Sequence, residues 1–365
     1  MKSNYSPIKK LSKQIKKNEA WLISDPHSIN YLTSCKTLLP EEREAYLIVN
    51  PKQSFLIQSS FSPKNHNNEI KTLLGISTPQ VKRYLEQIIQ ELKLEVLYID
   101  KDSLFVSEYE WLQNISTKGR PASGWKIQNI NKNLIWDLRL IKKSQEIKLI
   151  KKACQIANKS LVKVLNNLKE GTTELEIKKE LIKSFYDLGA DGEAFPSIVA
   201  FGANSALPHH QPWETRLKPN MPVLIDCGAM YKSYRSDMTR TVWFGNNPSA
   251  EFIKVEKIIL AAYKSALAKL NQRAEITAAN LDYTARQVIS QACYGNKFIH
   301  TTGHGIGLEV HEPPSLNFQN NQKIKPNMII TIEPGIYLEN NFGYRHENTI
   351  LITKTKFIEL TKTLS

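Results

Sequence analysis

The chain has 365 residues, of which 41% are apolar and 23% are charged, and its formal net charge is +14. This length fits two domains of ordinary size, and the composition is typical of a globular protein. No stretch approaches the ~18 consecutive apolar residues of a membrane-spanning helix, so we predict no membrane segment. The lysines occur mostly singly or in pairs, without a long basic run, so we also predict no specific nucleic-acid partner.

The N-terminal segment, residues 1–17, is basic but has neither a compact apolar core nor a small-residue cleavage site. It is therefore not a secretory signal, and the helical spacing of Ile8, Leu11 and Ile15 predicts a short surface helix. The four cysteines are far apart and form no CxxC pair. A disulfide framework or zinc ribbon is not expected, and the reducing cytoplasm is the predicted location.

The first part of the chain has the pattern of an α/β domain, which we assign to residues 1–137. Apolar residues recur at helical spacing over 79–94, and the predicted strands are 20–23, 44–49, 54–58 and 96–99. His27 and His66 are isolated in this part, so we predict surface or structural roles for them. Nothing in this domain indicates catalysis.

Residues 138–365 form the second predicted domain, in which helices and strands are interleaved. Ser144 is the expected N-cap of a long helix that ends at Gly171. Thr173 and Glu176 match a capping box that opens a helix to about residue 188, and two further helices are predicted at 250–270 and 277–292. Five strands are predicted, at 197–201, 222–226, 236–242, 328–332 and 347–352. Their closeness in the chain indicates an α+β fold with antiparallel hairpins rather than a doubly wound parallel sheet.

Two aspartates stand at unusual places in the second domain. Asp226 ends the apolar strand 223–225, where a carboxylate is costly to bury unless it is paired or bound to a metal. Asp237 follows inside a strand-like run, and residues 228–235 can form the hairpin that brings the two side chains together. Two carboxylates in contact repel each other, so such a pair indicates a cation between them.

Three more candidate ligands follow further along the chain. His304 lies in the glycine-rich segment 303–307, where backbone can approach a site closely, and Glu333 ends an apolar run before Pro334. Arg345 and Glu347 are two residues apart, so in a strand they point to the same face. Arg345 is thus a candidate to contact the ligands or the substrate, whereas His346 points to the opposite face.

Four carboxylates and one histidine make a hard, oxygen-rich donor set. Such a set suits divalent ions, with Mn²⁺ or Co²⁺ more natural than a thiolate-type zinc site. Two ions about 3.5–4 Å apart can share a bridging water and lower its pKa. The prediction depends on the joint spacing of the five residues, because any one of them alone would be an ordinary paired or exposed side chain.

Six short blocks of the second domain occur in a fixed order: residues 207–210 (LPHH), 224–229 (LIDCGA), 236–241 (SDMTRT), 303–312 (GHGIGLEVHE), 332–335 (IEPG) and 345–348 (RHEN). Together these blocks closely resemble the Xaa-Pro aminopeptidase and Xaa-Pro dipeptidase (prolidase) branch of the pita-bread metallopeptidases. The resemblance is strong from residue 139 to the end. Residues 1–137 resemble the creatinase-type N-terminal domain of that branch. The implied fold is therefore α+β, with a C-terminal pita-bread catalytic domain preceded in the chain by a smaller α/β domain.

The resemblance implies a role for each matching residue. It implies five metal ligands, with Asp237 and Glu347 bridging both ions: Asp226, Asp237, His304, Glu333 and Glu347. It implies that His209 and His311 assist proton transfer and hold the substrate, that Glu333 also handles a proton, and that His300 and Arg345 support the site. The implied cofactor is a pair of divalent ions, Mn²⁺ first and Co²⁺ or Zn²⁺ as alternatives.

The chain departs from the family pattern at a few positions. His346 and Asn348 stand where many relatives have isoleucine and aspartate, which removes a charge next to the ligand Glu347. Cys227 stands where relatives often have an aromatic residue, and we predict a buried small side chain there. His210 matches a variable position, so no catalytic role is predicted for it.

The predicted function is hydrolysis of the N-terminal Xaa-Pro bond of peptides, as by a Xaa-Pro aminopeptidase. The alternative is a Xaa-Pro dipeptidase that acts only on dipeptides. A methionine aminopeptidase is less favoured because of the first domain, the block 207–210 and Arg345, and creatinase lacks this ligand set. A non-enzymatic binding module is also less favoured, because all five ligands are kept. The expected partners are proline-containing peptides and a second copy of the chain in a homodimer.

Overall fold

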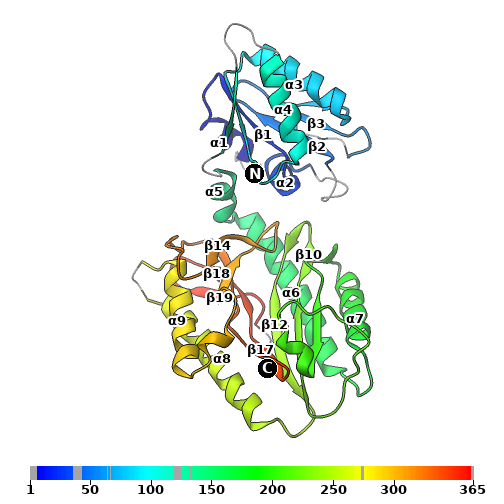
Figure 1. Ribbon diagram of the computed structural model, residues 1–365, viewed down its shortest axis with the longest axis vertical. Coiled ribbons are helices and arrows are strands. Elements are labelled where there is room, and N and C mark those ends of the chain that lie inside the picture. The colour runs from blue at the N-terminus through cyan, green and yellow to red at the C-terminus, as the bar shows by residue number, and fades with distance from the viewer. Residues whose placement is uncertain are drawn as a thin grey trace. The chain divides into compact units, whose positions relative to one another are not determined.

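The computed structural model describes residues 6–35, 43–63, 65, 67–118, 125–130, 134–272 and 275–362. The chain divides into two compact units, Met1–Arg139 and Leu140–Ser365 (Figure 1). The predicted domain boundary between residues 137 and 138 lies two residues earlier, inside the short helix α5 (Leu134–Leu140).

The first unit is built on one six-stranded mixed sheet. Its strand order is β4 (Ile70–Leu74), β3 (Ser54–Gln58), β2 (Ala45–Val49), β1 (Glu19–Ile23), β5 (Val96–Ile99) and β6 (Lys126–Asn129). The pairs β1–β2 and β2–β3 are antiparallel, whereas β1–β5, β3–β4 and β5–β6 are parallel. All four predicted strands are present, β3 and β5 with the bounds that the sequence predicts.

Helices α3 (Thr78–Leu92) and α4 (Val106–Lys118) lie side by side over this sheet in Figure 1. The apolar face of α3, including Leu85 and Ile88, packs with buried strand residues into one core. Helices α1 (Pro7–Ser12) and α2 (Pro26–Thr33) contact each other and β2. The predicted N-terminal surface helix is present, since Ile8 and Leu11 are buried while Lys9 and Lys10 are exposed, but it ends before Ile15. His27 lies in α2 at intermediate exposure, and His66 lies outside the described residues.

Four helices frame the second unit: α6 (Ser144–Asn166), α7 (Glu174–Asp187), α8 (Ala250–Leu270) and α9 (Ala278–Gln291). Thr173 and Glu176 form the predicted capping box, since each main-chain N–H donates to the other side chain, at 3.1 and 2.8 Å. The predicted cap Ser144 is wrong. Lys143 is the N-cap, because its N–H donates to the Glu146 carboxylate at 2.9 Å, and the helix ends five residues before Gly171. None of the described helices has the length and apolar character needed to cross a lipid bilayer.

Every strand pairing that the structure describes in this unit is antiparallel, as the α+β prediction requires. The first group of strands consists of two three-stranded sheets. One has the order β12 (Met238–Phe244), β9 (Met221–Cys227), β8 (Ile198–Phe201), and the other has the order β11 (Tyr234–Arg235), β10 (Ala229–Tyr231), β7 (Gly192–Glu193). The second group has the order β14 (Glu312–Leu316), β13 (Gly303–Gly305), β15 (Ile329–Ile332), β18 (Asn348–Ile352), β19 (Phe357–Glu359), beside the hairpin of β16 (Gly335–Leu338) and β17 (Phe342–Arg345).

The two groups of strands have separate cores. Helices α6 and α7 pack with the first group around Leu161, Leu181 and Ile225, and α8 and α9 pack with the second around Ile259 and Ile330. In Figure 1 the strands lie between α7 on one side and α8 and α9 on the other. The candidate site lies where the two groups of strands meet, because each group contributes ligands to the same pocket.

Candidate active site

The β9–β12 hairpin brings Asp226 and Asp237 into one pocket, as the sequence predicts. The two strands pair with Asp226 opposite Thr239, so Asp237 lies one residue beyond the paired end of β12. A tight approach within the hairpin needs glycine at position 228, because a Cβ there would lie 1.9 Å from the Ser236 carbonyl oxygen.

The second group of strands supplies the other three predicted ligands. His304 is the middle residue of β13, Glu333 follows β15, and Glu347 precedes β18. Because Ile332 pairs with Asn348, the two glutamates leave their strands at the same end of the ladder. Gly305 allows β13 to pack closely against the next segment, since a Cβ there would lie 2.1 Å from the Pro313 carbonyl oxygen.

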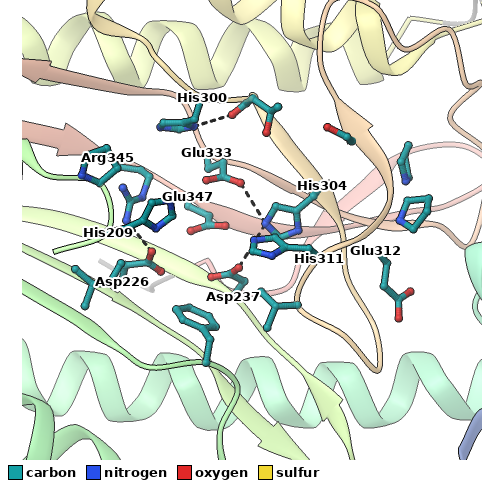
Figure 2. Close-up of a pocket in the computed structure, with 18 of the residues that line it drawn as sticks. His209, Asp226, Asp237, His300, His304, His311, Glu312, Glu333, Arg345 and Glu347 are labelled. Carbon is teal, nitrogen blue, oxygen red and sulfur yellow. Dashed lines mark hydrogen bonds and ion pairs between the residues drawn. The ribbon is translucent and has the colours of Figure 1, made fainter. Parts of the chain in front are cut away.

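The five predicted ligands line one pocket, and three of them form a compact cluster (Figure 2). Ligand atoms of Asp237, His304 and Glu347 all lie within 4.8 Å of one another. His304 Nε2 also lies 3.2 Å from Glu333 Oε1 and 3.6 Å from Asp237 Oδ2. Asp226 stands next to this cluster, where its Oδ2 accepts a hydrogen bond from Arg345 at 2.6 Å.

Three carboxylate oxygens of the predicted ligands have no hydrogen-bond partner among the described residues. They are buried and belong to Asp226 (Oδ1), Asp237 (Oδ1) and Glu347 (Oε1). A buried oxygen without a donor is costly, and a divalent cation is the partner that hard oxygen atoms in such number suit. The donor set therefore fits a metal site at Asp237, His304 and Glu347. The other two predicted ligands, Asp226 and Glu333, line the same pocket.

Burial and mutual repulsion decide the charge state of the cluster. Burial, then the neighbouring carboxylates, raise the pKa of Asp237 and of Glu347 well above the ordinary values. Burial opposes ionisation of Glu333, but the hydrogen bond and charge of His304 lower its pKa to about 2. In turn, burial disfavours the charged form of His304, and Glu333 more than compensates, so the pKa of His304 is raised.

Metal binding by this cluster should release protons. Asp237, Glu347 and His304 all have raised pKa values, so a cation that needs their deprotonated forms must displace protons near neutral pH. We expect the apparent affinity for Mn²⁺ to increase from pH 6 to pH 8. Titration calorimetry of EDTA-stripped protein in two buffers of different ionisation enthalpy measures the protons, and equal heats in both buffers would contradict the expectation.

The pocket beside the cluster has a volume of about 830 Å³ and is lined partly by apolar side chains, among them Phe195, Ile198 and Pro208. His209 and His311 line it too, and the His311 ring meets the His304 ring edge-on, with 4.5 Å between centroids. Burial, then the charge of His304, lower the pKa of His311, so this ring is neutral at neutral pH. A neutral imidazole can accept or donate a proton there.

Arg345 and His300 are joined through a residue that the sequence analysis missed, Tyr337. Arg345 donates to the Tyr337 hydroxyl at 2.6 Å, and that hydroxyl lies 2.8 Å from His300 Nε2. Because His300 Nδ1 lies 2.8 Å from the Thr301 carbonyl oxygen, Nδ1 carries the proton and Nε2 accepts from Tyr337. Burial raises the pKa of Tyr337 to about 12, so the hydroxyl stays a donor. In the sequence, the one feature that could have pointed to Tyr337 is its place in the strand that follows the candidate ligand Glu333.

The residues that depart from the family pattern have structural contacts. His346 turns away from the pocket, as predicted, and its ring packs edge-on against Tyr263, with 4.8 Å between centroids. Burial and then the charge of Arg240 lower the pKa of His346 to about 3. Asn348 accepts from Arg240 at 2.8 Å. Cys227 is fully buried in the core of the first strand group, which confirms the prediction for that position.

A buried ion pair supports the segment that carries His311. Lys142 Nζ lies 3.0 Å from Glu312 Oε2, and both side chains are 2% exposed. Glu312 also accepts from the Leu308 N–H at 2.9 Å, and its carboxylate points away from the metal cluster in Figure 2. The pair thus stabilises the turn before His311 without contacting the ligands.

Replacing Lys142 with methionine should destabilise the protein by about 3–5 kcal/mol, because Glu312 would lose its buried cationic partner. Adding Glu312→Gln to Lys142→Met should recover a large part of that loss. Urea unfolding of the two variants and the wild type measures this. Equal stabilities for the double and the single variant would show that the charge of Glu312 is not what costs stability.

Comparison with known proteins decides the family. A model of metallopeptidase family M24 matches residues 148–354. The chain belongs to this family. It is 38% identical over 255 residues to a Xaa-Pro dipeptidase of Pyrococcus furiosus, covering 70% of this chain and 71% of that one. It is 33% identical over 348 residues to an uncharacterized peptidase of Staphylococcus aureus, covering 94% of both.

Solved structures of the same kind match almost the whole chain. The Xaa-Pro dipeptidase from Bacillus anthracis superposes with a TM-score of 0.86 at 30% identity, over 98% of this chain and 97% of that one. An X-Pro aminopeptidase from Thermotoga maritima has a TM-score of 0.82 at 28% identity, over 97% and 98%. The chain is therefore a metal-dependent peptidase with an N-terminal α/β domain followed in sequence by a pita-bread domain, as the resemblance predicts.

Proposed function

We propose that this M24 peptidase uses two divalent ions to hydrolyse the bond between an N-terminal residue and a following proline. The observation that supports it best is the pocket in which five potential ligands meet and three buried carboxylate oxygens lack a donor among the described residues. When bound, two such ions activate a shared water and stabilise charge on the carbonyl oxygen. The relatives named as Xaa-Pro peptidases supply the substrate class.

The ligands in this proposal are Asp226, Asp237, His304, Glu333 and Glu347. Asp237 and Glu347 would hold the metal together with His304, since ligand atoms of all three lie within 4.8 Å of one another. Mn²⁺ is the proposed ion because four of the five ligands are carboxylates, and Co²⁺ or Zn²⁺ are alternatives.

The remaining pocket residues handle protons and orient the substrate. Glu333 is proposed to take a proton from the attacking water and to pass it to the leaving nitrogen. His311 and His209 both line the pocket, and they are proposed to donate hydrogen bonds to the carbonyl oxygen that gains charge. His300 and Arg345 hold Tyr337 and Asp226 in place. The leaving proline nitrogen comes from a tertiary amide, so it must gain a proton to depart as an amine.

Dipeptides are the proposed first substrates. Two relatives that are 38% identical over 255 residues are named Xaa-Pro dipeptidase, whereas an X-Pro aminopeptidase is a structural relative at 28% identity. The aminopeptidase prediction from sequence is therefore less well supported than its dipeptidase alternative.

Hydrolysis of Ala-Pro and Ala-Pro-Ala by metal-stripped protein, with and without Mn²⁺, tests the proposal. Cleavage of Ala-Pro that requires Mn²⁺ supports it, and cleavage of Ala-Pro-Ala as well would restore the aminopeptidase assignment. Pro-Ala, which has no Xaa-Pro bond, is the negative control. Met-Ala-Ser tests the methionine aminopeptidase alternative. Folded, metal-bound protein that cleaves none of these peptides would contradict a peptidase function.

A cytoplasmic homodimer is part of the same proposal. All four cysteines are free thiols in the structure, which fits a reducing compartment. Light scattering coupled to size-exclusion chromatography tests the dimer, and a mass of one chain would contradict it.

A further inference from the structure

The carboxylate of Glu174 collects four hydrogen bonds from one loop. Glu174 is the first residue of α7 and is fully buried. Its Oε1 accepts from the Phe201 N–H at 2.8 Å and from Asn204 Nδ2 at 2.9 Å. Its Oε2 accepts from the Trp213 N–H at 3.1 Å and lies 2.8 Å from His210 Nε2. One side chain thus joins both ends of the loop 201–213.

This loop brings His209 to the pocket. His209 lines the pocket, yet no hydrogen bond holds its ring among the described residues. Its place therefore depends on how the backbone around it is fixed. Neither large apolar side chain that flanks the two histidines is a buried anchor, since Leu207 is 58% exposed and Trp213 is 70% exposed.

His210 is the side chain that ties this backbone to the interior. Its Nε2 must donate to Glu174, because an ionised carboxylate is acceptor-only. The first half of the loop has its own anchor, since Ser205 accepts from the Gly343 N–H at 2.9 Å. Trp213 is held a second time, because its carbonyl accepts from the Leu175 N–H at 3.1 Å. The stretch between these two fixed points contains His209 and His210.

We propose that Glu174 is a positioning residue that acts through His210 to hold His209 at the pocket. The inference rests on the proposed function, in which His209 contacts the substrate. It also assigns different roles to two adjacent histidines. His210 is engaged with a buried carboxylate and is structural, whereas His209 is free to bind.

A double-mutant cycle on kcat/KM for Ala-Pro with Mn²⁺ tests the coupling. Glu174→Gln keeps the side-chain volume, but its single amide oxygen can accept from only two of the four donors, and the other two face an NH2 group. We expect it to lower kcat/KM by about 100-fold, the size of effect that a small misplacement causes. His209→Ala should lower kcat/KM by at least as much, and the double variant should equal His209→Ala within about twofold. If the loss of kcat/KM in the double variant instead equals the product of the two single losses, the proposal is overturned.

Glu146→Gln is the matched control in the same cycle. Glu146 is also a buried first-turn glutamate, bonded to the Lys143 N–H at 2.9 Å and to the Tyr234 hydroxyl at 3.0 Å, but it does not line the pocket. Its effect on kcat/KM should be small and should add to that of His209→Ala. Coupling of the same size in this control would show that Glu174 acts only through stability.

Two readouts do not need peptidase activity, so they separate this inference from the proposed function. Glu174→Gln should bind Mn²⁺ with the wild-type affinity, because Glu174 contacts none of the five ligands. In histidine-ring NMR spectra, the His209 signal, assigned by its loss in His209→Ala, should shift or broaden in Glu174→Gln. An unchanged His209 signal would overturn the proposal even if the wild type cleaves no Xaa-Pro peptide.

A second pair of variants keeps the test open if Glu174→Gln does not fold. His210→Gln retains a donor for Glu174, whereas His210→Phe retains only the bulk. We expect kcat/KM to stay close to the wild-type value in the first and to fall about 100-fold in the second. Equal activities of the two variants would contradict a role for the Glu174 contact.

Discussion

Asp237→Asn should abolish Mn²⁺-dependent hydrolysis of Ala-Pro, with kcat/KM lower by on the order of a thousandfold, or about 4 kcal/mol. Asp237 is buried in the compact cluster, and its Oδ2 lies 3.6 Å from His304 Nε2. Asparagine has nearly the same shape but supplies one neutral oxygen in place of a charged carboxylate. Titration calorimetry should show weaker Mn²⁺ binding in the same variant.

The same change should stabilise the protein when metal is absent. The raised pKa of Asp237 means that the folded protein binds its proton more tightly than the unfolded chain does. The stability of the metal-free wild type therefore falls as the pH rises from about 4 towards the raised pKa. Asparagine removes this charge, so Asp237→Asn should gain about 1–3 kcal/mol at pH 8 in EDTA and less at pH 5.

Thermal unfolding in EDTA and in saturating Mn²⁺ measures both effects in one experiment. Mn²⁺ should raise the melting temperature of the wild type strongly and that of Asp237→Asn weakly. Asp187→Asn, an exposed aspartate on α7, is the matched control and should change neither value. A variant that is destabilised in EDTA yet still stabilised by Mn²⁺ would contradict a ligand role for Asp237.

Local patterns in the sequence predicted most of the second unit. Helix α8 has the bounds that its apolar spacing predicts, and the capping box at Thr173 begins α7 where expected. The candidate ligands stand out in the sequence for the same reason, since Asp226 and Glu333 each end an apolar strand. Such positions combine burial with charge, and a single sequence shows both.

The start of α6 shows why capping predictions fail. A serine is a good N-cap, so Ser144 was the natural choice. The glutamate at 146 lies three residues after Lys143, however, and its carboxylate reaches back to the Lys143 N–H. The two possible caps differ by one residue, and the acceptor that reaches back selects between them.

Contacts between distant segments could not be predicted. Tyr337 meets His300 across 37 residues, and Glu174 meets Trp213 across 39. In the sequence, Glu174 is one of several acidic residues in a helix first turn, where an exposed position is the ordinary expectation. Only the fold shows that this carboxylate is buried and that four donors converge on it.

Arg345→Ala should cause the second large effect, a loss of about 3–5 kcal/mol of stability in metal-free protein. Arg345 is 3% exposed, and its three donor groups all have partners. It donates to Asp226 at 2.6 Å, to Tyr337 at 2.6 Å and to Thr239 at 3.0 Å. Alanine would leave the buried Asp226 carboxylate without its cation and the other two groups without a donor.

Arg345→Lys separates charge from geometry. Lysine keeps a positive charge near Asp226 but cannot reproduce the planar fork that reaches Tyr337 and Thr239 as well. We expect a stability between those of the wild type and Arg345→Ala. Affinity for Mn²⁺ should fall by about 10–100-fold in Arg345→Ala, because the orientation of the ligand Asp226 is lost.

Metal should reduce the stability cost of Arg345→Ala, because a bound cation compensates the same carboxylate. Urea unfolding in EDTA and in saturating Mn²⁺ should therefore give a smaller difference from the wild type with metal than without it. Arg216→Ala is the control, since Arg216 donates to the Gly171 carbonyl at 2.8 Å near the surface, away from the pocket. A cost that is the same with and without Mn²⁺ would mean that Arg345 stabilises the fold by packing and hydrogen bonds rather than by charge compensation of Asp226.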